Sequence, residues 1–584
     1  MTDAEVNSGL QDNHDHDNLD PDGDAVTPTI VTPPLLRLPT EMLALILQEF
    51  ALPLSRRRAD FDPHWKCSVI DASALRPVAQ TCRRLREVVM SLPPIVKTVI
   101  ISEDTPFDTD KMQAVSKDIP LNVYISFVHR TPQEVRDWYM AEAHRIQELH
   151  LTRLANLNMD SWVPLLALLA PKLRFFSIAT SGVAWLPPKG SLLSLPQASH
   201  LRHLTLRKVC FLPRNHFPFL THLALIDVRL PRFDKTFLAF LSRCPNLESL
   251  VLDHSQESIM ERPVSTMRLH LPHLQRVTLE RPDKDGLYLM SIPHNRCMAL
   301  QLLSPNVKSD VARLILPKFS PDPHTLRIVH LEPPRVYKEI SDPGSWRSLY
   351  GEWSSASLTS VGPTGTFHVR CTSPSEIEGP HYEAQRAMLE DKSALASVRT
   401  LWLVGMQATR PIKDTDTPTM TIPWAEFRLV GYMSFVHRVA IAMRDLIVGL
   451  SALETLVYIL PHTLEPNLWI LPNTTHRLFA SRCLKTLKLV ICHGIGLRTS
   501  ETVKRPELKL GKVCEGLETG KCAYLDTLIL QMAVNVVIDD TELLQISKYV
   551  PTVKVERIDS IPQMTVPEYC REPSCSSSRV GALW

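Results

Sequence analysis

Leu201-Arg202-His203-Leu204-Thr205-Leu206 and Leu220-Thr221-His222-Leu223-Ala224-Leu225 are two copies of one apolar pattern, L-x-x-L-x-L. The pattern recurs along most of the chain, and most copies lie about 27 residues apart or about twice that, as in proteins built from stacked short repeats. The other clear copies begin at Val96, Ile146, Leu173, Leu247, Leu274 and Leu326, and after a break at Val398, Leu453, Leu484 and Leu525. This spacing predicts an α/β solenoid, in which each repeat adds one strand to a curved parallel sheet.

Within each copy, apolar and polar residues alternate as they do along a strand that has one buried face. Leu204 and Leu206 should therefore point into the core, while Thr205 and Arg207 should point out from the concave surface. Proline before a strand, as at Pro245, ends a preceding helix, and residues 234–243 predict one such return helix.

This pattern resembles that of leucine-rich repeats, a family in which each unit gives one strand to a parallel sheet and a helix or loop returns the chain. The family position that normally carries asparagine or cysteine holds Val209, Val228, Ser255 and Pro282 in successive copies, with Cys492 as the exception. Without those side chains the internal hydrogen-bond ladder is mostly absent. The resemblance therefore implies an irregular array over residues 94–565, with an insertion at 332–395 that the repeat does not explain.

A second pattern precedes the repeats and begins with Leu38-Pro39-Thr40-Glu41. Pro39 suits the first turn of a helix, where its missing N–H is no loss, and Glu41 lies near the positive end of the helix dipole. The apolar residues that follow recur with the period of a helix that has one apolar face: Met42, Leu43, Ile46, Leu47 and Phe50. The same periodicity predicts a second helix with a shared face: Leu75, Val78, Ala79, Cys82, Leu85 and Val89.

These two helices, in residues 35–93, resemble the F-box, a motif that opens with Leu-Pro-x-Glu, closes with Val-Cys-x-x-Trp and binds the Skp-type adaptor of cullin-RING ubiquitin ligases. The resemblance implies the following adaptor-binding residues: Leu38, Pro39, Met42, Leu43, Ile46, Val78, Cys82 and Leu85. Leu38 and Pro39 would be anchors in the interface, whereas Leu43, Leu47 and Val78 would hold the two helices together. Thr81 stands where the family prefers valine, Leu85 where it prefers tryptophan, and the connection 52–73 is longer than usual. An ordinary two-helix element remains the alternative.

Charge and composition predict tails at both ends. Residues 1–34 contain eight acidic residues and no lysine or arginine, so they should form a disordered acidic tail. The serine-rich end of the chain predicts a flexible tail over residues 566–584. Dense positive charge is limited to Arg56–Arg58 and Arg83–Arg86, which is not the extended basic surface that nucleic-acid binding requires.

Several classes of protein are not indicated. The acidic amino terminus lacks the features of a signal peptide, and the apolar run 162–171 is too short to cross a bilayer. The twelve cysteines are scattered without a C-x-x-C pair, which favours reduced thiols in the cytoplasm or nucleus. Motifs for nucleotide binding or hydrolysis are missing, and His14 with His16 lie in a tail that is unsuited to a closed metal site. We therefore expect no enzyme activity, no cofactor and no metal site.

The order of the parts is acidic tail, helical module and repeat array, which is similar to the F-box and leucine-rich-repeat class, with large sets in basidiomycete fungi. The resemblance implies a substrate-recognition subunit of a Skp-cullin-F-box ubiquitin ligase. Its partners would be the Skp-type adaptor and a target protein, with neither nucleic acid nor membrane. Target contacts would fall on the concave strands and on the 332–395 insertion. Two alternatives remain: a leucine-rich-repeat scaffold with a degenerate F-box, and an enzyme with a site spread across the array.

Overall fold

We describe the protein from a computed structural model, in which the chain forms two compact units, residues 1–51 with 73–92 and residues 52–72 with 93–584. The structure describes residues 34–50, 68–69, 75–92, 95, 97–103, 119–127, 132–154, 171–180, 200–209, 211–213, 215–228, 233–253, 271–280, 298–303, 322–331, 355–371, 395–405, 446–447, 449–460, 466, 483–492, 506–518, 523–567 and 570. The expected acidic tail, apart from Pro34, lies outside these residues.

The smaller unit is helical. Its elements are the 3-10 helix η1 (Pro34–Arg37) and the α-helices α1 (Thr40–Phe50), α3 (Arg76–Thr81) and α4 (Arg83–Ser91). Helix α1 begins where the sequence predicts, and its first bond runs from the Leu43 N–H to the Pro39 carbonyl at 3.0 Å. Helix α1 packs against α4, whose Arg84 guanidinium donates hydrogen bonds to the carbonyls of Leu36 and Leu38.

The expected second helix is two helices, because the backbone at Cys82 is extended with φ −154° and ψ 163°. The Cys82 sulfur accepts a hydrogen bond from the Leu85 N–H at 3.5 Å and so caps α4. Val88 joins Leu85 and Val89 on the buried side of α4, whereas the expected face did not include it.

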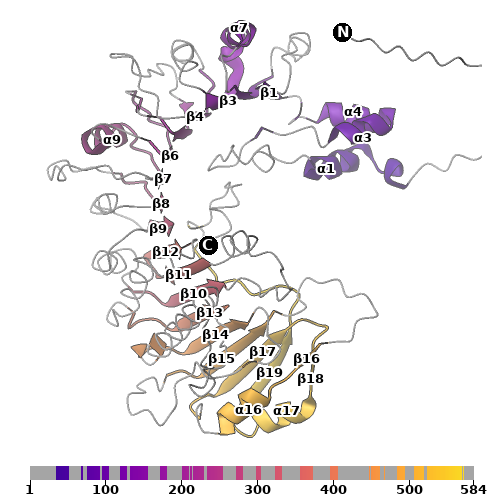
Figure 1. Ribbon diagram of the computed structural model, residues 1–584, viewed down its shortest axis with the longest axis vertical. Helices are drawn as coiled ribbons and strands as arrows, with labels where there is room; N and C mark the ends of the chain where they lie inside the picture. Colours follow the sequence, from indigo (N-terminus) through magenta and orange to yellow (C-terminus); the bar gives the residue numbers. More distant parts are fainter. Residues whose placement is uncertain are drawn as a thin grey trace, which may run out of the picture. The chain divides into compact units, whose positions relative to one another are not determined.

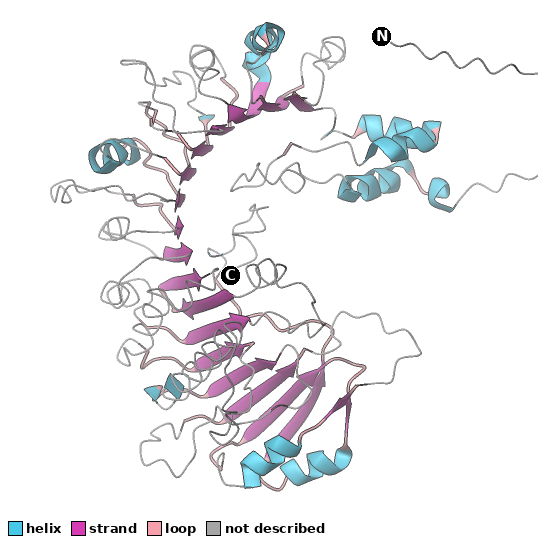
Figure 2. Ribbon diagram, in the orientation of Figure 1, coloured by secondary structure: helices cyan, strands magenta, loops and turns pink. Residues whose placement is uncertain are grey.

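The larger unit is built on a sheet of 17 strands, counted among the described residues (Figures 1 and 2). In chain order the strands are β1 (Thr98–Ser102), β2 (Leu121–Ser126), β3 (Ile146–Leu154), β4 (Phe175–Thr180), β5 (His203–Arg207), β6 (His222–Ile226), β7 (Ser249–Asp253), β8 (Arg276–Glu280), β9 (Met298–Leu303), β10 (Thr325–Leu331), β11 (Ser355–Val361), β12 (Gly365–Cys371), β13 (Thr400–Val404), β14 (Thr455–Leu460), β15 (Thr486–Ile491), β17 (Thr527–Met532) and β19 (Thr552–Arg557). The sheet is mostly parallel, and the molecule is of the mixed α/β class.

The predicted repeat strands are confirmed. Strands β5, β6, β7 and β8 are neighbours, all parallel, and pair Leu204 with Leu223, Leu223 with Leu250, and Leu250 with Val277. Strands β13, β14, β15 and β17 repeat this parallel arrangement after the break. The regular spacing of the leucines therefore corresponds to the register of the sheet.

Residues 355–371, inside the insertion 332–395, form two strands of the sheet, which the repeat pattern did not predict. These strands, β11 and β12, form an antiparallel hairpin whose turn is closed by the Gly362 N–H and the Gly365 carbonyl at 2.9 Å. Strand β12 pairs with β9 in parallel, and β11 pairs with β10 in antiparallel fashion, so the spatial order is β9-β12-β11-β10-β13. A tight turn reverses chain direction, which explains the antiparallel strand in this otherwise parallel sheet.

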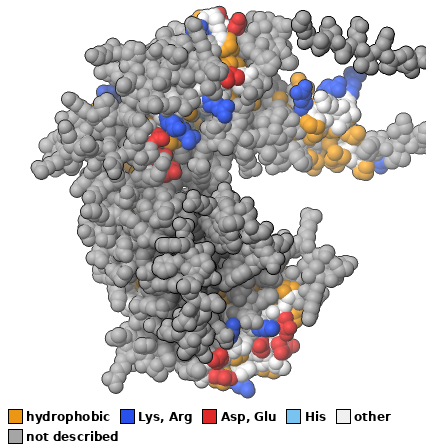
Figure 3. All heavy atoms as spheres, in the orientation of Figure 1, with side chains coloured by type: hydrophobic (Ala, Val, Ile, Leu, Met, Phe, Trp, Pro, Cys, Tyr) orange, Lys and Arg blue, Asp and Glu red, His pale blue; other side chains and the backbone are white. Residues whose placement is uncertain are grey.

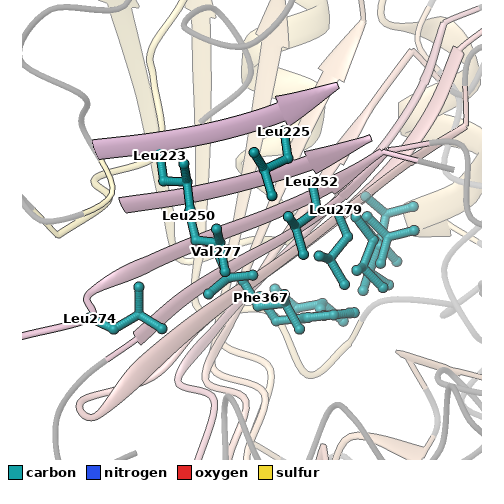
Figure 4. Close-up of a cluster of buried hydrophobic side chains, with 14 of the residues drawn as sticks. Leu223, Leu225, Leu250, Leu252, Leu274, Val277, Leu279 and Phe367 are labelled. Carbon is teal, nitrogen blue, oxygen red and sulfur yellow. The ribbon is translucent and has the colours of Figure 1, made fainter. Parts of the chain in front are cut away.

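The core lies on the leucine face of the sheet, and Figure 4 shows part of it. Phe367 of β12 is buried in the same cluster as Leu223, Leu252 and Leu279, so the hairpin continues the core. Helices α7 (Gln133–Glu142) and α9 (Phe233–Leu241) cover this face on the outer side of the curved sheet (Figure 2), and α9 confirms the predicted return helix at 234–243. The remaining described elements are η3 (Ala143–Arg145), α16 (Gly511–Glu518), α17 (Asp540–Ile546) and the short strands β16 (Glu507–Leu508) and β18 (Val537–Ile538).

Residues with left-handed backbone conformation end several strands. Lys208 and Asp227 have φ of 55°, and their N–H groups donate to the carbonyls of Ile226 and Asp253 on the next strand. Gly405 at φ 80° makes the corresponding bond to Ile459. This conformation turns the chain out of the sheet and still leaves the backbone N–H hydrogen-bonded to the next strand.

Substituting Gly405→Ala is expected to destabilise the protein by about 1 kcal/mol, because a side chain disfavours the left-handed region. The matched control is Lys208→Gly, which removes a side chain from the same conformation and should change stability by less than about 0.5 kcal/mol. Urea unfolding of the two variants measures both effects. Equal stability of Gly405→Ala and the wild type would contradict a structural requirement for glycine at this turn.

Candidate functional site

The first candidate site is an apolar surface on α1, which we call the α1 surface: Pro39, Met42, Leu45 and Ile46. Met42 and Leu45 are 48% and 59% exposed, Pro39 is exposed and Ile46 is half-buried. Figure 3 shows hydrophobic side chains gathered over α1. On the adjoining face of the same helix, Leu43 and Leu47 are buried in the core of the unit. The α1 surface is therefore available to a partner.

The structure divides the predicted adaptor-binding residues into two groups. Pro39 and Met42 are exposed, and Leu38, Ile46, Val78 and Cys82 are half-buried. Leu43 and Leu85, in contrast, are only 1% and 6% exposed. Those two side chains belong to the interior of the helical unit, so their assignment as direct contacts is corrected: they can support the surface but cannot reach a partner. Leu43 thus fills the packing role that was expected for it.

Sequence reasoning missed Leu45 as a member of this surface. Leu45 is not among the apolar residues that recur with the helical period from Met42 and Leu43, so that pattern does not group it with them. The sequence does place Leu45 one helical turn after Met42, on the side away from the buried residues. That spacing could have identified it as part of the surface.

The second candidate site is the face of the sheet opposite the core, which we call the inner face. It carries the side chains that alternate with the leucines, as predicted for Thr205 and Arg207. At β2 and β3 these side chains form a buried polar network. The Glu148 carboxylate lies 2.7 Å from the His150 ring, and the Thr152 hydroxyl donates to the Tyr124 hydroxyl at 2.9 Å.

A piece of the long connection between α1 and α3 covers this network. The Ser68 N–H donates to both carboxylate oxygens of Glu148, at 3.1 and 3.2 Å. Val69 is fully buried against Tyr124, with Ile100 beside them. The connection therefore contributes to the inner face rather than forming only a surface loop.

A stacked column of rings runs across β4, β5 and β6. Phe175 stacks on His203 and His203 stacks on His222, each at 4.3 Å between ring centroids. The Arg276 guanidinium lies 3.3 Å from His222 Nε2. We call Phe175, His203, His222 and Arg276 the histidine column. Because parallel strands in register place equivalent residues in a row, the column follows directly from the repeat.

Burial keeps both histidines of the column neutral at pH 7. It lowers the pKa of His203 to about 4, with a smaller opposing effect from Glu148. Burial also lowers the pKa of His222 to about 3, and the neighbouring His203 and Arg276 add to this effect. The two side chains act here as aromatic and hydrogen-bonding groups rather than as cations.

The inner face becomes apolar toward the carboxyl end of the chain, and the chain's own end covers it. Ile558 packs against the apolar cluster Val404, Val457, Ile459 and Val490. The side chains of Met564, Val566 and Cys570 are buried in one cluster with Ala299, Val361 and Trp402. The flexible tail predicted from residue 566 therefore begins too early, because Val566 and Cys570 are packed; residues 571–584 lie outside the described residues.

Other kinds of site receive no support from the described part of the chain. Its helices are all too short or too polar to cross a membrane. Within the same residues, no three histidine, cysteine or acidic side chains gather closely enough to hold a metal ion, and His14 and His16 lie outside them. What the geometry offers is apolar and polar surface for binding. No protein-family model and no curated protein matches the chain.

Proposed function

We propose that this protein is a substrate-recognition subunit of a Skp-cullin-F-box ubiquitin ligase, built on an F-box-like helical unit and an irregular leucine-rich-repeat array. The α1 surface would bind the Skp-type adaptor, and the inner face of the sheet would bind a target protein. The chain itself would perform no bond chemistry and need no cofactor. It would act in the cytoplasm or nucleus by raising the effective concentration of its target near the ubiquitin-charged enzyme.

One observation carries this proposal. In a unit whose own core is closed by Leu43, Leu47, Leu85, Val88 and Val89, two large apolar side chains on α1 remain about half exposed. Exposed apolar side chains that gather on one helix face are typical of a docking site, since water solvates them poorly. The surface begins at the Leu-Pro-x-Glu sequence on which the resemblance rests.

The double substitution Met42→Ala and Leu45→Ala should weaken binding of a purified Skp-type adaptor by about 100-fold. Truncating an interface anchor costs about 1–2 kcal/mol, and two anchors together give a loss of this size if their effects add. Titration calorimetry or surface plasmon resonance with the full-length chain measures the change. Thermal unfolding should be nearly unaltered, because neither side chain is in the core of the unit.

The matched control is Leu544→Ala on α17, a leucine that is 69% exposed on a helix of the other unit. It should bind adaptor as the wild type does. Equal affinity of the double variant and this control would refute docking through the α1 surface.

The alternative is a repeat scaffold whose helical unit no longer binds an adaptor. Leu85 favours this alternative, because the position where the F-box prefers tryptophan holds a smaller side chain that is buried inside the unit. If wild-type protein binds no adaptor in the same titration, the scaffold function replaces the ligase function.

A further inference from the structure

The part of the inner face that spans β9, β11 and β13 is covered although it lies opposite the core. Thr366 and His368 of β12 and Thr359 of β11 point to this face and are almost fully buried. Their neighbours Ala299, Val361 and Trp402 form the apolar cluster with Met564, Val566 and Cys570. The covering side chains thus come from the end of the chain.

The covering segment, residues 561–570, has the form of a bound peptide. Residues 561–567 lie outside any helix or strand, and up to residue 566 the side chains alternate between exposed and buried: Ile561, Gln563 and Thr565 are exposed, whereas Met564 and Val566 are buried. Alternation with a period of two is that of an extended chain on a surface. Pro562 and Pro567 flank the buried pair; each fixes its own φ and disfavours the helical conformation of the residue before it, which lowers the entropy lost on binding.

The face beneath the segment carries both polar and apolar side chains, which limits the affinity of the segment for it. Thr359, Thr366 and His368 are polar and buried on it, beside the apolar Ala299 and Val361. Release of the segment would restore the conformational freedom of its backbone and side chains, and it would return water to these three polar side chains. Three buried side chains, those of Met564, Val566 and Cys570, oppose these gains.

We propose that the inner face across β9, β11 and β13 is a binding site for an extended segment of a partner protein with two apolar side chains two residues apart, and that residues 561–570 are its displaceable internal occupant. The partner segment has this form because the occupant that the site already holds has it. Access to the site is then controlled by the end of the same chain. The inference does not depend on adaptor binding, so either can fail without the other.

The test uses the full-length chain and a fluorescein-labelled peptide of residues 559–571. In the double variant Met564→Asp and Val566→Asp the internal segment loses its apolar anchors, so the labelled peptide should bind at least tenfold more tightly than it binds the wild type. A closed site lowers the apparent affinity for a second ligand by the fraction of open molecules. Fluorescence anisotropy measures both affinities.

The matched control is Ile561→Asp with Thr565→Asp, which adds the same two charges to the same segment at exposed positions. It should resemble the wild type in peptide affinity. Adding Trp402→Ala to the released variant should abolish the gain, because Trp402 belongs to the site. Equal peptide affinity of the released variant and the control, or a gain that survives loss of Trp402, would overturn the proposal.

A second measurement needs no variant and so does not depend on how the variants fold. Excess unlabelled peptide, made with Cys570→Ser so that it carries no thiol, should raise the rate at which iodoacetamide alkylates Cys570 of the wild-type protein, as followed by mass spectrometry. Cys244, which is buried behind α9 in the core, should stay protected and reports that the fold is intact. An unchanged Cys570 rate at saturating peptide would show that the segment is a fixed part of the fold, and the proposal would be wrong.

Discussion

Lowering the pH from 7 to 5 is expected to reduce the stability of the wild-type protein by about 4 kcal/mol through His203 and His222 alone. The folded pKa values are about 4 and about 3, whereas the unfolded value is 6.5. Between those values the unfolded chain takes up protons that the native protein does not. The free energy of unfolding is therefore undiminished by these two groups above pH 6.5. It decreases as the pH falls toward the folded pKa values, by about 2 kcal/mol for each histidine at pH 5.

The variant that tests this carries His203→Phe and His222→Phe. Phenylalanine keeps the stack on Phe175 but does not titrate, so the loss of stability between pH 7 and pH 5 should shrink by about 4 kcal/mol relative to the wild type. Urea unfolding followed by circular dichroism at the two pH values gives the difference.

The matched control replaces two exposed histidines, His144→Phe and His216→Phe. Comparing the column variant with this control separates the effect of the two buried rings from the effect of replacing histidine by phenylalanine elsewhere on the protein. If the column variant keeps the full wild-type pH dependence, the two rings take up protons at pH 5 as readily in the folded protein as in the unfolded chain, and the prediction is wrong.

The repeat strands could be predicted from the sequence because their leucines satisfy two constraints at once. Leu223 and Leu250, for example, must alternate with polar residues along the strand and must also meet across neighbouring strands, so both strand and register appear in the spacing. The start of α1 was predictable for a comparable reason, since proline and acidic residues have defined places in the first helical turn.

The hairpin, the inner-face contacts and Leu45 were not predictable in the same way. Strand β11 reads Ser-Ala-Ser-Leu-Thr-Ser-Val, which is polar enough for a loop, and only its pairing with β10 and β12 makes it a strand. The stacking of His203 on His222 depends on which repeats become neighbours. The cluster that contains Met564 and Ala299 joins parts of the chain that no local pattern connects.

Substituting Phe367→Ala is expected to destabilise the middle of the sheet by about 4 kcal/mol, the usual cost of deleting a fully buried ring. Phe367 is completely buried, pairs with Leu300 of β9 and Ser360 of β11, and lies in the core cluster shown in Figure 4. In a stacked array each strand depends mainly on its neighbours. The loss should therefore be concentrated in β9, β11 and β12, as faster amide hydrogen exchange, while β5 and β6 keep their protection.

The control for this prediction is Phe219→Ala, because Phe219 is 51% exposed and its truncation leaves no core cavity. Its exchange pattern should match that of the wild type apart from small changes near His200, on which it stacks. The comparison tests the topology as well as the packing. If residues 355–371 were a surface insertion, Phe367→Ala would be as mild as Phe219→Ala, and β9 would not respond to it. Faster exchange in β9 would instead show that β12 is its neighbour in the sheet. The two strands are far apart in the sequence, so the effect of the substitution must pass through their pairing and the shared core.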